Sequence, residues 1–225
     1  MTFKAKALSL VRRGKREVIL TAIGFNGGNN LFKWQLAYSR TLDKGLISKV
    51  LYFPNQDAWL EMFPGLRKLS ITSDQMRFTD RRATYMGAAQ GADYTPQERA
   101  RFIKDVLLTS DGFKQSLERA QAFVRDDDLV INVRRGDYYN SRFEPEFGIN
   151  IVEYVRQALA KQLALGPVGR VVLVSDNVPW CVDNLTHLAP QLEFVVNENR
   201  RDMFDDLAVL ACAKRLILAN STFSY

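Results

Sequence analysis

The second half of the chain alternates short apolar runs with amphipathic stretches. The apolar runs, which are typical of buried strands, lie at 129–133, 171–174, 192–196 and 216–219. Apolar positions at helical spacing predict helices over 151–163, 180–188 and 203–214. Strands that alternate with helices in this way predict a parallel sheet with right-handed crossovers.

The first half shows a similar but less regular pattern. Residues 18–23 predict a buried strand because they are rich in β-branched side chains, and a glycine-rich loop follows them. Residues 67–93 show little periodicity. The other predicted elements are a helix over 31–42, a strand over 50–53, and helices over 96–108 and 113–124. Both halves together predict an α/β fold.

Three consecutive aspartates at 126–128 stand between the two halves. We place the domain boundary there and divide the chain into residues 1–125 and 126–225. Asp126 and Asp128 have the Asp-x-Asp spacing that metal-dependent glycosyltransferases use. They precede a predicted strand instead of following one, however, so we interpret them as a solvated linker and expect no metal ion.

Composition restricts the class of protein. Hydrophobic residues make up 47% and charged residues 25% of the 225, which is typical of a soluble globular protein. No apolar run approaches the roughly 20 residues that span a bilayer, and polar residues interrupt residues 1–16 too often for a signal peptide. Cys181 and Cys212 fall inside predicted helices, which favours a reducing compartment. The sequence therefore indicates a cytoplasmic protein.

The net charge of +6 suits three kinds of partner: nucleic acid, an anionic membrane or an anionic substrate. The basic residues are scattered, apart from clusters at 12–16 and 81–82, and no nucleic-acid-binding motif accompanies them. We therefore expect no nucleic-acid partner. Most of this charge is interpreted as solvated surface, with a share for phosphate binding, and a peripheral contact with the inner membrane face stays open.

The most informative segment is the arginine pair Arg134 and Arg135, which stands on a glycine turn after the apolar run 129–133. Each guanidinium offers a planar fork of donors that matches phosphate oxygens, so a diphosphate is the expected ligand. The alternative is an ion pair, for example with Asp137. Polar residues that follow the predicted parallel strands should gather on the same rim. They are Arg134, Arg135, Asp176, Asn220, Ser221 and Thr222.

Structural roles compete with ligand binding at several of these positions. Ser221 and Thr222 could cap a following helix. Asp176 could accept hydrogen bonds from a nucleotide, or Asp176 or Asn177 could cap the helix that contains Trp180. Asp206 lies at a predicted helix start, where negative charge is stabilising, and we favour a structural role for it.

Four segments, in order, carry a resemblance to a known family. They are Gly28-Asn29-Asn30-Leu31-Phe32, then Val133-Arg134-Arg135-Gly136-Asp137-Tyr138, then Ser175-Asp176-Asn177 with Trp180-Cys181, and finally Asp206-Leu207 with Ile217-Leu218-Ala219-Asn220-Ser221-Thr222-Phe223-Ser224. Together they resemble the motifs of glycosyltransferase family 11, the α-1,2-fucosyltransferases. The resemblance implies a GT-B-like architecture of two Rossmann-like domains with mostly parallel sheets. Residues 1–125 would face the acceptor, and residues 126–225 would bind GDP-fucose.

The implied reaction is inverting transfer of L-fucose from GDP-fucose to the 2-hydroxyl of a galactoside, without a metal or other cofactor. By this resemblance Arg134 and Arg135 bind the diphosphate, and Arg135 also offsets the charge on departing GDP. Asp137 is the expected general base, with Glu144 as the alternative. The further substrate-binding residues that we predict are Asn29, Asn30, Asn132, Asp176, Asn220, Ser221 and Thr222.

Two departures from the family pattern qualify this expectation. The family usually has histidine where this chain has Asn132, which can form hydrogen bonds but cannot titrate. The family motif also continues with two tryptophans, whereas this sequence stops at Tyr225, so we expect an incomplete C-terminal domain. A catalytically impaired, nucleotide-sugar-binding remnant of the same family is therefore the alternative. A basic protein that binds nucleic acid is a more distant one.

Overall fold

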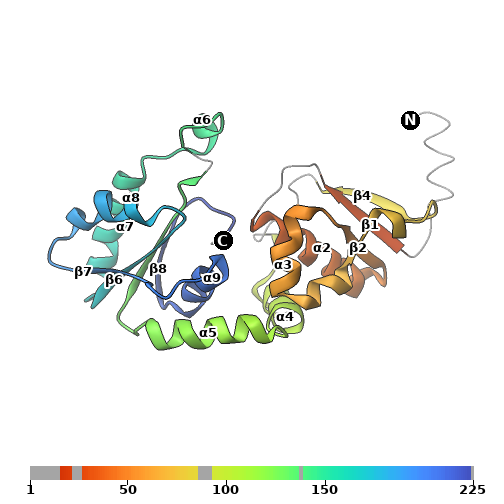
Figure 1. Cartoon of the computed structure of the whole chain (residues 1–225), viewed down its shortest axis with the longest axis horizontal. Coiled ribbons are helices and arrows are strands. Elements are labelled where there is room, and N and C mark those ends of the chain that lie inside the picture. Colours follow the sequence, from red (N-terminus) through yellow and green to blue (C-terminus); the bar gives the residue numbers. More distant parts are fainter. Residues whose placement is uncertain (1–15, 22–26, 86–92, 137–138, 224–225) are drawn as a thin grey trace. The chain divides into compact units, whose positions relative to one another are not determined.

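Each half of the chain folds around its own parallel sheet (Figure 1). The computed structural model describes residues 16–21, 27–85, 93–136 and 139–223. The chain divides into two compact units, Met1–Phe113 and Lys114–Tyr225. The predicted α/β fold class, with two units that are each built on a parallel sheet, is confirmed.

The first unit contains strands β1 (Arg16–Thr21), β2 (Ile47–Leu51), β3 (Ser70–Ile71) and β4 (Arg81–Tyr85). They pair in the order β3-β2-β1-β4, and every described pair is parallel. The described helices are α2 (Asn29–Lys44), α3 (Asp57–Met62) and α4 (Pro96–Phe102), with shorter helical turns at Pro54–Gln56, Pro64–Leu69, Ser73–Gln75 and Ile103–Leu107. α2 packs against β2, and the core includes the fully buried Val18, Ile19 and Trp34.

Helix α3 and strands β3 and β4 of this unit had no counterpart in the sequence prediction. β4 lies at the edge of the sheet, and most of its side chains are exposed or half-buried. A strand of this kind carries no apolar run, so periodicity cannot reveal it. Only its pairing with β1, from Glu17 and Arg81 to Thr21 and Tyr85, defines it.

The second unit follows the predicted pattern closely. Its strands are β5 (Leu129–Val133), β6 (Arg170–Ser175), β7 (Glu193–Val196) and β8 (Arg215–Leu218), and all described pairs are parallel, in the order β7-β6-β5-β8. Its helices are α6 (Glu144–Phe147), α7 (Ile151–Ala164), α8 (Val178–Leu185) and α9 (Met203–Cys212), with a short helical turn at Thr186–Leu188.

One hydrophobic cluster of the second unit lies on the face of the sheet that helices α7 and α8 cover. Leu129, Ile131 and Val133 point to this face from β5, as their alternation along the strand requires, and Val155 and Leu185 pack against them from the two helices. Both β5 and β6 are buried along their whole length. This burial on both faces is what a parallel sheet inside an α/β unit requires.

Helix α5 (Asp111–Phe123) crosses the boundary between the units. The division falls after Phe113, earlier than the aspartates of 126–128, because the helix is bonded to the second unit. Arg119 pairs with Asp205 at 2.9 Å, and the carbonyl of Phe123 accepts from Arg170 at 2.6 Å.

The interpretation of residues 126–128 as a solvated linker is wrong for Asp128. This side chain is buried, and both of its oxygens accept from Arg170, at 2.8 and 3.1 Å. Asp126 is exposed and pairs with Lys214. The partner of Asp128 lies at the start of β6, so the sequence around 126–128 could not show that the carboxylate is buried.

Candidate functional site

The candidate site lies where the strands of the second sheet end. Val133 pairs with Ser175, and Asn132 pairs with Leu218, so the loops after β5, β6 and β8 leave the sheet side by side. β5 and β8 are neighbours although β8 comes last in the chain. The strand order therefore reverses beside β5, and open α/β sheets bind ligands at such a switch point.

Asp176 holds the arginine pair in place. Its Oδ1 accepts from the backbone N–H of Arg135 at 2.8 Å, and its Oδ2 lies 3.0 Å from Nη1 of Arg134. Arg134 thus forms an ion pair with Asp176, whereas Asp137, the partner considered from the sequence, lies outside the described residues. The pair is partly exposed, with 39% of the Arg134 side chain and 26% of the Asp176 side chain accessible. One carboxylate therefore fixes both the loop backbone and one of the two guanidinium groups.

Gly136 allows this close packing. A Cβ atom at this position would lie 2.6 Å from Oδ2 of Asp176 and 3.1 Å from the guanidinium carbon of Arg134. A side chain at this position would displace the Asp176 carboxylate or the Arg134 guanidinium, so glycine leaves room for the pair as it stands.

Arg135 is held by aromatic rings. Its guanidinium carbon lies 3.9 Å from the ring centre of Tyr139 and 4.1 Å from that of Trp180. Tyr139 is itself anchored, because its hydroxyl donates to the carbonyl of Ile149 at 2.8 Å. Sequence reasoning missed both aromatic roles, although Trp180 belongs to one of the segments that carry the family resemblance.

At the start of α8, the residue that caps the helix is Asn177 and not Asp176. Asn177 caps the helix, with its side chain accepting from the backbone N–H of Trp180 at 3.2 Å, and Ser175 Oγ accepts from the N–H of Asn177. Asp176 is left to bind the arginine loop. Cys181, on the same helix, is buried, and burial raises the pKa of its thiol.

Asn132 lies inside the sheet. Its side chain is 5% exposed, and its Nδ2 donates to the carbonyl of Val174 at 3.2 Å. Among the described residues, its buried Oδ1 has no donor. The side chain thus ties β5 to β6, and its free acceptor lies next to the rim.

The segment after β8 is anchored to β5. The N–H of Ala219 donates to the carbonyl of Asn132 at 3.0 Å, which places Asn220, Ser221 and Thr222 beside the arginine loop. Ser221 is buried, and its Oγ accepts from the N–H of Phe223 at 3.2 Å. This bond stabilises a local turn.

Of the two candidate bases, Asp137 lies outside the described residues. Glu144 is exposed at the start of α6, where its Oε2 accepts from the backbone N–H of Asn140 at 2.8 Å. Glu144 therefore supports the loop that carries Tyr139.

In the first unit, the predicted residues Asn29 and Asn30 belong to the first turn of α2 instead of a loop. Asn30 is fully buried, and its Oδ1 accepts from Nζ of Lys33 at 2.8 Å. Lys33 is 1% exposed, and burial lowers its pKa to about 8. Polar groups are thus concentrated inside the carboxyl end of this sheet as well.

The structural interpretation of Asp206 is confirmed. Arg200 binds both of its oxygens, at 2.8 and 2.7 Å, while Asp202 caps α9 by accepting from the N–H groups of Phe204 and Asp205. A cavity of about 360 Å³ lies nearby, between α5 and the turn after β7. It is lined by none of the predicted site residues, so it does not belong to the candidate site.

Among the described residues, His, Cys, Asp and Glu side chains form no group of three or more that could hold a metal ion. In the same part of the chain, every helix is too short or too polar to span a membrane.

Comparison with known proteins gives one family match. Residues 94–225 match the family described as Glycosyl transferase family 11. No curated protein sequence is a significant match.

Several solved structures resemble the chain. POFUT1 in complex with GDP (crystal-form-III) is 15% identical with a TM-score of 0.42, over 76% of this chain and 53% of that one. A high-resolution dataset of POFUT1 with GDP is 11% identical with a TM-score of 0.49, covering 93% and 92%. POFUT1 with GDP-fucose (crystal-form-II) is also 11% identical with a TM-score of 0.49, covering 93% of each chain. The chain therefore spans about half of the first of these structures and most of the other two.

Proposed function

The chain belongs to glycosyl transferase family 11, and on this premise we propose that it transfers L-fucose from GDP-fucose to the 2-hydroxyl of a galactoside. The observation that carries the proposal is the arginine loop at the switch point of the second sheet. Two guanidinium groups are held there by Asp176, Tyr139 and Trp180. Such preformed positive charge suits a ligand with adjacent phosphates.

In the proposed reaction the 2-hydroxyl oxygen attacks the anomeric carbon of fucose. The bond from that carbon to the diphosphate oxygen breaks, and GDP leaves with the electron pair, so the anomeric configuration inverts. The hydroxyl proton passes to a carboxylate. Arg135 stabilises the charge that develops on GDP, which is the role of a preorganised donor. Arg134 binds the same diphosphate.

We propose Asp137 as the general base because it follows the phosphate-binding loop directly, with Glu144 as the alternative. Asp137→Asn should abolish transfer while GDP affinity stays within about threefold, since the base acts on the acceptor. Glu144→Gln is the matched variant. If Glu144→Gln loses transfer and Asp137→Asn retains it, Glu144 is the general base instead of Asp137.

The principal test is incubation with GDP-fucose and a panel of galactosides, followed by analysis of the linkage in the product. We expect a fucosylated galactoside substituted at its 2-hydroxyl. Binding of GDP with no transfer to any acceptor would favour a catalytically impaired, nucleotide-sugar-binding protein of the same family. Nucleic-acid affinity that falls steeply with salt, without GDP binding, would contradict both.

The arginines can be tested by calorimetry. Arg134→Ala and Arg135→Ala should each weaken GDP binding by roughly 1.5–3 kcal/mol, the range of a charge-assisted hydrogen bond. Lysine should rescue only part of this loss because it lacks the planar fork. Wild-type GDP affinity in both alanine variants would disprove the diphosphate role.

Neutralisation of the diphosphate by arginine also makes a prediction about metal dependence. A chelator should leave both GDP binding and transfer unchanged, since no step of the proposed reaction needs a cation. Activity that is lost with chelator and restored by manganese would contradict this mechanism.

A further inference from the structure

We propose that Tyr139 and Trp180 form an aromatic cage that fixes the guanidinium of Arg135 in one plane, so that Arg135 recognises phosphate through its edge and cannot stack on a base. The inference rests on the proposed function, in which the arginine loop binds the diphosphate. Tyr139 comes from the loop after β5, and Trp180 from the first turn of α8. The cage therefore joins two segments that are far apart in the sequence.

The distances show how the rings meet the guanidinium. Its carbon lies about 4 Å from both ring centres, which is the spacing of two flat groups in contact. An N–H directed into a ring would place the carbon farther away, because the nitrogen lies between them. In the proposed cage each ring covers one face of the guanidinium, and since the group has only two faces, Tyr139 and Trp180 lie on opposite ones.

This arrangement leaves the edge of the guanidinium as the route of approach. The N–H donors of arginine lie in the plane of the group and point outward from its edge. A nucleobase that stacked on Arg135 would have to displace a ring, whereas phosphate oxygens can meet the donors in the plane. The cage thus selects for phosphate over base at this position.

The two arginines are held by different means. Asp176 binds the guanidinium of Arg134 but reaches Arg135 only through its backbone N–H. Half of the site is thus fixed by a carboxylate, and the other half by rings. Rings position a cation without using its hydrogen-bond donors, so Tyr139 and Trp180 are positioning residues that keep Arg135 available for the ligand.

Calorimetry with three probes, GDP, inorganic pyrophosphate and guanosine, tests the cage. Trp180→Leu and Tyr139→Leu should each weaken the binding of GDP and of pyrophosphate by a similar factor, on the order of tenfold. The affinity for guanosine should not change. Trp180→Phe and Tyr139→Phe keep an aromatic ring, so their affinities for GDP and pyrophosphate should stay within about threefold of the wild-type values. The Tyr139→Phe variant also distinguishes the contribution of the ring from that of the hydroxyl, which donates to the carbonyl of Ile149.

Phe143→Leu is the matched control. Phe143 lies on the same loop, but the cation over its ring is Arg142, at 4.8 Å. Its removal should leave the affinity for GDP and pyrophosphate unchanged. Thermal unfolding of every variant shows whether a loss of affinity comes from the cage or from a general loss of structure.

Fluorescence provides a readout that does not depend on the ligand. Trp34 and Trp59 are buried in the first unit, so a change on Arg135→Ala reports on Trp180. We expect a shift in emission with Arg135→Ala and a smaller one with Arg135→Lys. If wild-type protein binds neither GDP nor pyrophosphate but the emission shifts, the proposed function fails and the cage stands. Leucine variants with wild-type affinity for both ligands, or with a loss confined to guanosine, would overturn the inference.

Discussion

The two ends of the second sheet carry the same kind of ion pair in opposite settings. At the amino ends of the strands, Asp128 pairs with Arg170, and their side chains are 0% and 9% exposed. At the carboxyl ends, Asp176 pairs with Arg134, and their side chains are 26% and 39% exposed. Identical chemistry thus closes one end of the sheet and leaves the other accessible.

The closed pair is held by further hydrogen bonds from the fold around it. Asp128 accepts from Arg170 and from the backbone N–H of Arg125, while Arg170 also donates to the carbonyl of Phe123. Such a pair supports the fold and offers nothing to a ligand. Asp176 organises a loop whose guanidinium groups remain near solvent. The exposure of an Asp–Arg pair therefore distinguishes a structural role from a binding role here.

The largest expected effect follows from breaking the closed pair. Asp128→Ala leaves Arg170 buried without its carboxylate, so the free energy of unfolding should fall by about 3–5 kcal/mol. Urea denaturation measures this loss. Asp126→Ala is the matched control, because Asp126 is exposed and its pair with Lys214 should contribute less than about 1 kcal/mol. Equal losses of unfolding free energy in the two variants would contradict the distinction between the buried and the exposed ion pair.

Breaking the open pair should affect binding more than stability. Asp176→Ala should lower the free energy of unfolding by no more than about 1 kcal/mol, because both partners are partly exposed. GDP affinity should fall about tenfold, since the loop loses its anchor at the N–H of Arg135. Calorimetry and urea denaturation on the same sample check both numbers. A large loss of stability with unchanged GDP affinity would show that Asp176 has a structural role and not a binding role.

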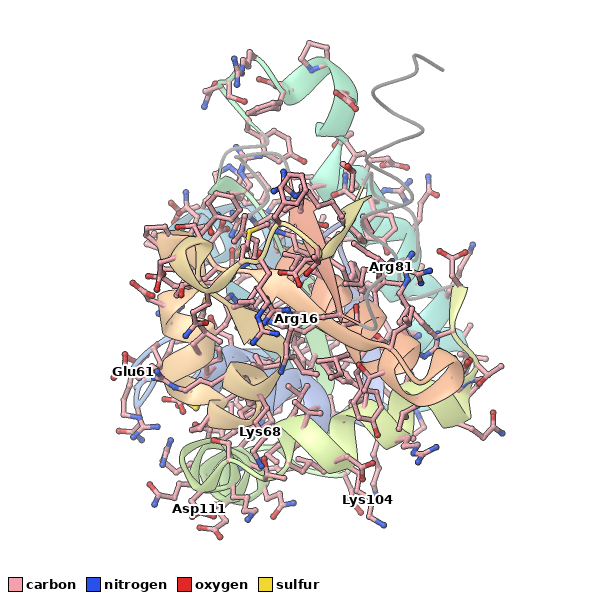
Figure 2. The ribbon with its side chains drawn as sticks, turned by 90° about the vertical axis from the view of Figure 1, so that its right-hand side faces the viewer. Arg16, Glu61, Lys68, Arg81, Lys104 and Asp111 are labelled. Atoms are coloured by element: carbon pink, nitrogen blue, oxygen red, sulfur yellow. The ribbon has the colours of Figure 1, made fainter. Side chains whose placement is uncertain are left out.

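The smallest effect concerns a third pair, in the first unit. Asp80 is buried and binds Arg16, which is labelled in Figure 2, at 2.6 and 2.8 Å. The hydrogen bond from Arg16 lowers the pKa of Asp80. Its stabilisation is therefore complete above the unfolded pKa of about 4 and is lost as the pH falls toward the lowered folded value.

Asp80→Asn should accordingly reduce stability by about 1 kcal/mol at pH 6 and by less at pH 3. The emission of Trp34 and Trp59, both in the core of the first unit, follows its unfolding in urea. A difference between wild type and variant that grows on acidification would contradict the sign of this argument.

The sequence predicted the second unit well because most residues of each of its strands are apolar. The apolar run 129–133 matches β5 at both ends, and the predicted helix at 151–163 matches α7 to within one residue. The rule that parallel strands end on one edge also brought Arg134 and Asp176 together correctly, at 3.0 Å. Local pattern and topology were sufficient for these features.

The rest depended on partners far away in the chain. β4 has few buried side chains, and the burial of Asp128 depends on an arginine at the start of another strand. The rings that hold Arg135 likewise come from two different elements. A single sequence contains these residues but does not show which of them meet.

Helix α5 has a consequence for how this fold can be inherited. The family match begins at residue 94, ahead of this helix, although the second sheet begins only at Leu129. Arg119 and the carbonyl of Phe123 hold Asp205 and Arg170 of that unit. A recombination event at the aspartates of 126–128 would separate these partners, whereas one before α4 would keep them on the same segment. A segment that keeps these partners together therefore includes α5 and begins well upstream of the second sheet.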